Sequence, residues 1–321
     1  MGQTVGGSAS APGTTTGAGV DPVALGAREW PLRTVIVDGA ELCVREVPDA
    51  AADAPRAVFV HGLGGSSLGF TALGWLLADV VRGVAIDLPG FGRTPPRATP
   101  YGISEHADLV QAYVDGVSGE AVHLVGNSMG GAVAVQVAAR RPDLVRTLTL
   151  ISPALPDPRP SVTAAWFAAM ATPRLGAAML RRSARLPFER RVHIGMSMIF
   201  GDHAGLPPEV IQAYEDELRR REGVPWVTDA LVAGARSVVL SALKPPRRSL
   251  WAEAAKVRCP VLLVYGGRDR LIDSRIRNRA QQAFGDARLL FIPDSGHVAQ
   301  IEHPAEVARA VRQLISHPRH S

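Results

Sequence analysis

Short apolar runs alternate with helix-like segments along most of the chain, and this alternation limits the fold more than any other feature. The apolar runs lie at residues 57–60, 84–86, 121–125, 148–151, 261–265 and 289–292. Continuous apolar runs of this length indicate strands that are buried on both faces. Helical periodicity is found at residues 67–80, 104–117, 129–140, 274–284 and 298–315. Buried strands that alternate with helices predict an α/β fold, in which helices cover both faces of a mostly parallel sheet.

Two stretches break this alternation. Residues 33–47 form two short alternating runs around Asp38-Gly39, a dipeptide that favours the tight turn of a β-hairpin. Residues 154–255 contain helix-like segments punctuated by proline and show no clear strand. This stretch also holds four of the six methionines, namely Met170, Met179, Met196 and Met198. Any single one of these side chains more often belongs to the lid's own core, although flexible apolar side chains also suit a helical lid that faces a substrate.

These patterns predict a domain organisation. Residues 1–26 are rich in Gly, Ser, Thr and Ala, so we expect a disordered tail there. The alternating segments at 27–153 and 256–321 are expected to form one α/β core. The segment at 154–255 is expected to be a helical lid inserted into that core.

The composition excludes several classes of function. The formal net charge is +5, but acidic residues are interspersed throughout, so no basic surface for nucleic acid is expected. Cys43 and Cys259 are far apart and lack the spacing of metal ligands, which predicts neither a disulfide nor a zinc site. No secretory signal and no run of membrane-spanning length is found, so a cytoplasmic protein without a cofactor or metal is expected.

The segment Gly126-Asn127-Ser128-Met129-Gly130 follows an apolar run and opens a helical one. That is the setting of the G-x-S-x-G nucleophile elbow. A strand that turns sharply into a helix strains its central residue, and flanking glycines remove the Cβ atoms that would clash. The central hydroxyl is then held at the helix N-terminus, where the helix dipole favours negative charge. We therefore predict Ser128 as a nucleophile; the alternative is a small-residue turn without chemistry.

A serine hydroxyl needs a general base, and the base needs an acid to orient it. Asp269 follows the fifth apolar run and His297 follows the sixth, in the order Ser, acid, His that belongs to this elbow. We predict Asp269 as the acid and His297 as the base. Two other acids are possible by position: Asp157 follows the fourth run, and Asp273 more naturally caps the next helix.

A glycine-rich loop, His61-Gly62-Leu63-Gly64-Gly65, follows the first apolar run. Backbone N–H groups in such a loop can point at one oxygen atom. The N–H groups of Leu63 and Met129 are the expected pair for a tetrahedral oxyanion. His61 is expected to brace the loop rather than to react.

Taken together, these residues resemble the α/β-hydrolase superfamily over roughly residues 33–316. The resemblance rests on Val60-His61-Gly62, Asp87-Leu88-Pro89-Gly90-Phe91-Gly92, the Ser128 elbow, Gly267-Arg268-Asp269 and Gly296-His297. It implies a sheet of about eight strands, a lid before the fifth apolar run, and a pocket entrance framed by residues 87–92.

The elbow serine separates this chain from the epoxide hydrolases and haloalkane dehalogenases that it otherwise resembles, because those enzymes use Asp there. The segment Gly126 to Gly131 looks like the elbow of the meta-cleavage-product hydrolases, which cut carbon–carbon bonds. Those enzymes commonly carry Trp after the histidine, where this chain has Val298. We therefore place hydrolysis of a small apolar acyl ester first and carbon–carbon hydrolysis second. A non-turnover small-molecule receptor is the alternative of another class.

The expected lid carries a basic cluster, Arg181, Arg182, Arg185, Arg190 and Arg191. Such a cluster is most often a solvated helix face. The alternative is attraction to anionic lipid or acidic substrates. The sequence gives no indication of the oligomeric state.

Overall fold

The computed structural model describes residues 30–48, 50–97, 102–157, 162–285 and 287–317. The expected disordered tail at 1–26 lies outside these residues. The strands are β1 (Leu32–Val37), β2 (Ala40–Glu46), β3 (Arg56–Val60), β4 (Arg82–Ile86), β5 (Val122–Asn127), β6 (Val145–Ile151), β7 (Val261–Gly266) and β8 (Arg288–Ile292). They form one sheet of eight strands in the order β1-β2-β4-β3-β5-β6-β7-β8. Strands β3 to β8 pair in parallel, which confirms the predicted fold class.

The first two strands form the predicted hairpin. Asp38 and Gly39 both have positive φ, 48° and 72°, as a type I′ turn requires. Strand β2 then pairs antiparallel with β4, so the hairpin extends the parallel sheet at one edge.

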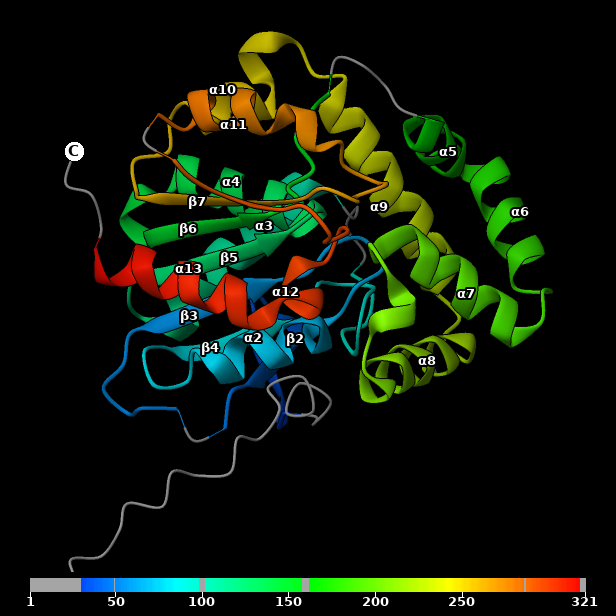
Figure 1. Cartoon of the computed structure of the whole chain (residues 1–321), viewed down its shortest axis with the longest axis horizontal. Helices are drawn as coiled ribbons and strands as arrows, with labels where there is room; N and C mark the ends of the chain where they lie inside the picture. Colours follow the sequence, from blue (N-terminus) through cyan, green and yellow to red (C-terminus); the bar gives the residue numbers. More distant parts are fainter. Residues whose placement is uncertain (1–29, 49, 98–101, 158–161, 286, 318–321) are drawn as a thin grey trace, which may run out of the picture.

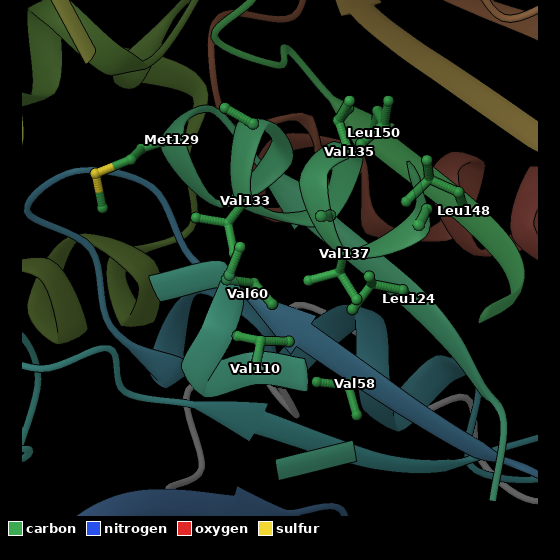
Figure 2. Packing of buried hydrophobic residues seen from close by; sticks show 14 of the residues in the cluster. Val58, Val60, Val110, Leu124, Met129, Val133, Val135, Val137, Leu148 and Leu150 are labelled. Carbon is green, nitrogen blue, oxygen red and sulfur yellow. The ribbon is translucent and has the colours of Figure 1, made fainter. Parts of the chain in front are cut away.

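Helices cover both faces of the sheet (Figure 1). One face carries α3 (Ile103–Ala112), α4 (Met129–Arg140) and α11 (Arg277–Ala283). The other carries α2 (Thr71–Leu76), α12 (Ala299–Glu302) and α13 (Pro304–Ser316). Figure 2 shows how β-branched side chains of β3 and α4, among them Val58, Val60 and Val133, pack together at the centre of the first face. This packing fixes α4, and with it the turn that precedes it.

Three sequence-based expectations need correction. The segment at 298–315 is not one helix: α12 ends at Glu302 and α13 begins at Pro304, because proline cannot donate the backbone hydrogen bond that would continue the helix. Strand β8 is not buried on both faces, because it is the edge strand; Phe291 is exposed and lies under the Arg277 guanidinium. The segment at 67–80 is helical only to Leu76, beginning with a 3₁₀ turn.

Between β6 and β7 the described residues contain helices and no strand. These are α5 (Val162–Met170), α6 (Pro173–Ser183), α7 (Phe188–Ile199), α8 (Pro208–Glu222), α9 (Val227–Ala242) and α10 (Leu250–Ala254). We call α5 to α9 the insert. Figure 1 shows α5 to α8 gathered beyond one end of the strands, whereas α10 lies with α11 beside α4. Within the described part of the chain, no helix is long and apolar enough to cross a membrane.

Candidate active site

Ser128 lies at the sharp turn between β5 and α4. Its φ is +54° and its ψ is −118°, a strained conformation for a residue with a side chain. Ser128 occupies the N-cap position of α4, yet its hydroxyl makes no capping hydrogen bond. The turn is fixed through its backbone, because the Ser128 N–H donates to the Ile151 carbonyl of β6 at 3.0 Å. The backbone of Ser128 therefore fixes the position of its hydroxyl, and the hydroxyl does not cap the helix.

The glycines on both sides of Ser128 are required by close packing, as the elbow pattern predicts. A Cβ on Gly126 would overlap the backbone of Gly130. A Cβ on Gly130 would overlap the carbonyl oxygens of Val60 and His61 at the end of β3. The turn can thus approach β3 closely only because neither position carries a side chain.

The structure brings Asp269 and His297 together across the ends of β7 and β8. Oδ2 of Asp269 lies 2.9 Å from Nδ1 of His297. Oδ1 accepts hydrogen bonds from the N–H groups of Leu271 and Ile272 at 2.8 and 3.0 Å. Burial alone would raise the pKa of Asp269, but the adjacent His297 and these hydrogen bonds outweigh it and hold that pKa below its usual value. The carboxylate is therefore ionised and fixed, as an orienting acid must be.

The structure gives Asp269, and neither of the two other acids considered from the sequence, as the partner of His297 Nδ1. The carboxylate of Asp273 accepts from the Arg275 N–H at 2.9 Å, which confirms its predicted role as a helix cap. Asp157 follows β6, and the Nδ1 of His297 is bonded to Asp269 instead.

The glycine-rich loop after β3 lies against Ser128. A Cβ on Gly62 would come within 3.0 Å of the Ser128 Cβ. Among the described residues, the Leu63 N–H has no hydrogen-bond acceptor, and Met129 is the first residue of α4, where helical N–H groups lack intrahelical partners. His61 braces the loop as expected: its Nε2 accepts from the Leu88 N–H at 3.0 Å, and its Nδ1 lies 2.7 Å from the Gly62 carbonyl.

A cavity of about 380 Å³ contains Ser128, His297 and the glycine-rich loop. Its other walls come from the insert and from the core segments 68–72 and 298–301. The insert side is mostly apolar or aromatic, with Trp166, Phe167, Met170, Met198, Phe200 and Tyr214 among its residues. Two of the four insert methionines therefore face the cavity, and a third, Met196, is buried within the insert. A larger hollow of about 610 Å³, beside α11 and β8, contains none of the predicted site residues.

Two residues that position His297 were not identified from the sequence. Nδ2 of Asn127 donates to the His297 carbonyl at 3.0 Å, and also to Ile151 O. Glu302 accepts from the N–H groups of Gly296 and Gly201, at 2.9 and 2.8 Å, and so joins the histidine loop to the end of α7. Asn127 lies inside the elbow pattern, so its place beside Ser128 could have indicated that it helps to build the site. No local signal marks Glu302.

His297 is consequently held from two sides. Its carbonyl is bonded to the sheet through Asn127, and its N–H donates to Ile199 of the insert at 2.7 Å. Arg270, beside Asp269, also reaches the insert through the carbonyl of Phe200 at 3.3 Å. The arrangement offers a hydroxyl, a base, an ionised acid and unpaired N–H groups around one cavity. Within the described residues, no group of His, Cys, Asp or Glu side chains could hold a metal ion.

Known proteins resemble this chain in sequence and in fold. Residues 55–304 match the alpha/beta hydrolase fold family. An acetyltransferase component of an acetoin cleaving system from Cupriavidus necator is 31% identical over 78% of this chain, which spans only 60% of that protein. A 2-hydroxy-6-oxononadienedioate/2-hydroxy-6-oxononatrienedioate hydrolase from Cupriavidus pinatubonensis is 26% identical over 82% of this chain and 87% of its own length.

A solved structure supports the same fold. The haloalkane dehalogenase DbeA from Bradyrhizobium elkani superimposes with a TM-score of 0.73 at 24% identity, over 89% of this chain and 97% of that one. The family match covers most of the sheet and the whole insert. The chain therefore belongs to the alpha/beta hydrolase fold family.

Proposed function

We propose that the protein is a serine hydrolase that cleaves an apolar carboxylic ester, with Ser128, His297 and Asp269 as its catalytic residues. The observation that carries this proposal is the strained serine, whose hydroxyl caps no helix and lines the same cavity as the histidine bonded to Asp269. A serine used only for structure would normally cap the helix that it precedes.

In the proposed reaction, His297 takes the proton of the Ser128 hydroxyl as Oγ attacks the ester carbonyl. The resulting oxyanion accepts hydrogen bonds from the N–H groups of Leu63 and Met129. Collapse of this intermediate breaks the bond to the alcohol, which leaves with the proton from His297, and an acyl-enzyme remains. Water then attacks the acyl group as His297 takes its proton. His297 returns this proton to the Ser128 Oγ as the acid is released.

The strongest test is covalent labelling with a fluorophosphonate probe. Wild-type protein should be labelled, and Ser128→Ala should not. Ser66 lines the same cavity and is the matched control, so Ser66→Ala should still be labelled. Absence of labelling of the wild type would contradict the proposal.

Turnover should follow the same pattern. With p-nitrophenyl esters, we expect Ser128→Ala to lose about 10⁴-fold or more in kcat. Asp269→Asn should lose about 10³–10⁴-fold, because the imidazole is no longer held in the correct tautomer. Wild-type turnover that never exceeds one product per protein, together with tight ligand binding, would favour a receptor instead.

Carbon–carbon bond hydrolysis is the second candidate, and one relative favours it. The matching hydrolase from Cupriavidus pinatubonensis acts, by its name, on an oxononadienedioate or oxononatrienedioate. The segment Gly126 to Gly131 also resembles the elbow of the meta-cleavage-product hydrolases. A ring-fission dienoate included in the ester panel separates the two candidates. Cleavage of the dienoate at a higher kcat/KM than every ester would replace the first proposal by the second.

A further inference from the structure

The insert contributes one permanent cation to the cavity that holds Ser128. Among the described residues that line this cavity, Arg221 is the only Arg or Lys. It lies near the end of α8, and its side chain is 22% exposed. A Cβ on Gly64 of the glycine-rich loop would lie 3.9 Å from the Arg221 Nη1 atom. The guanidinium is thus placed against the same loop that contacts Ser128.

The neighbouring Glu217 pairs more fully with Arg220 than with Arg221. Arg220 donates through Nε to Oε2 at 2.8 Å and through Nη2 to Oε1 at 2.7 Å, which is a bidentate pair. Arg221 adds only one bond, from Nε to Oε1 at 3.0 Å. Burial alone would raise the pKa of Glu217, but the two guanidiniums hold that pKa below its usual value, so Glu217 is ionised. Glu217 is thus shared between two guanidiniums, and two of its three hydrogen bonds come from Arg220.

The outer donors of Arg221 remain available to a ligand. Within the described part of the chain, Nη1 and Nη2 donate to no protein acceptor. Leu231, which offers no hydrogen bond, approaches the same point of Gly64 as the Arg221 Nη1 atom. A ligand that fills the cavity must replace the hydration of these donors, and an unpaired buried donor is costly. A wholly apolar ligand is therefore penalised at this place, and an acidic one is favoured.

We propose that Arg221 forms a subsite for a carboxylate carried by the substrate, so that the substrate is an apolar chain with an acid at one end. The ester bond that is cleaved is taken from the proposed function, and in this respect the inference rests on it. The binding of the carboxylate by Arg221 does not depend on the proposed function. The two oxygens of a carboxylate match the two Nη atoms of the guanidinium.

The subsite lies within reach of the nucleophile. The glycine-rich loop approaches Ser128 at Gly62 and the Arg221 guanidinium at Gly64. Two positions apart, these glycines have Cα atoms separated by no more than about 7 Å. A short apolar chain can therefore connect an ester at Ser128 with a carboxylate at Arg221.

The test compares charged and uncharged esters of equal length. One series is the monomethyl esters of straight-chain dicarboxylic acids, and the other is the matching methyl esters with a methyl group in place of the free acid. A third series, acetate esters of ω-hydroxy acids, places the acid on the alcohol side. Wild type should prefer the acid-bearing ester by kcat/KM at one chain length. In Arg221→Gln, the ratio of charged to uncharged kcat/KM should fall about 10- to 100-fold.

Two further variants make the result specific. Arg221→Lys keeps the positive charge but loses the two Nη donors of the guanidinium. Its ratio should therefore lie between those of wild type and Arg221→Gln. Arg219→Gln is the matched control, because Arg219 lies on the same helix, is 58% exposed and pairs with Glu215 outside the cavity. Its ratio should equal that of wild type. No preference for acid-bearing esters in wild type, or an unchanged ratio in Arg221→Gln, would overturn the inference.

The proposed function can fail separately. If no ester of any series is hydrolysed, the ester proposal is lost and calorimetric binding of the free dicarboxylates decides this inference. Saturable binding that weakens about 10-fold or more in Arg221→Gln supports the subsite, and equal or absent binding in both proteins overturns it.

Discussion

The end of the sheet and the insert build the cavity together, but they are packed in different ways. Ten of the twelve residues of α4 are buried, whereas none of the fifteen residues of α8 is. At the sheet, backbone packs on backbone; in the insert, long side chains are half-buried and paired with each other. Densely packed regions resist opening, and sparsely packed ones open more easily. The sheet therefore fixes Ser128 and its neighbours, and we expect the insert to determine which ligands reach them.

A pair of glycine substitutions should reveal this difference most strongly. In Gly130→Ala the new methyl group meets the backbone of Val60 and His61, which cannot move without displacing β3. We expect a loss of about 3 kcal/mol in the free energy of unfolding. In Gly195→Ala, on α7, it meets the hydroxyl of Tyr214, the far end of a side chain that can shift. We expect a loss below about 1 kcal/mol, because alanine also favours the helix. Urea unfolding measures both, and equal losses would contradict the comparison.

The two regions also differ in how far the sequence predicts them. The strand ends that bring Asp269 to His297, the elbow and the brace at His61 follow from apolar runs and glycine positions, because a parallel sheet aligns the ends of its strands. The division of the last helix could have been predicted from Pro304. The contacts of the insert could not be predicted from the sequence. Amphipathic periodicity shows which side of a helix is buried, but not which element packs against it. The hydrogen bonds of Glu302 and Arg221 depend on that packing.

Glu302 forms hydrogen bonds to both regions, so removal of its charge should weaken the connection between them. Glu302→Gln keeps the size of the side chain but weakens the bonds to the N–H groups of Gly296 and Gly201. Hydrogen bonds to a charged group contribute about 1.5–3 kcal/mol, so we expect a loss of about 2 kcal/mol in stability. Because the imidazole of His297 would be less well oriented, kcat should fall about 10-fold with a smaller change in KM.

The control for Glu302 is Glu306→Gln on α13. In the described residues the Glu306 carboxylate accepts no hydrogen bond, and the change of charge is the same. This variant should keep the kcat of wild type. If both variants lowered kcat equally, a role for Glu302 in positioning His297 would be excluded.

The smallest predicted effect concerns acid, and it acts on the sheet. Burial lowers the pKa of His123, on β5, to about 4 from 6.5. Between these values the unfolded chain binds a proton that the folded protein does not, so stability falls as the pH decreases. From pH 7 to 5.5 this histidine should cost about 1 kcal/mol. Urea unfolding of His123→Gln should show a correspondingly flatter pH dependence than wild type over this range. The same pH dependence in both proteins would show that acid destabilises the molecule through titratable groups other than His123.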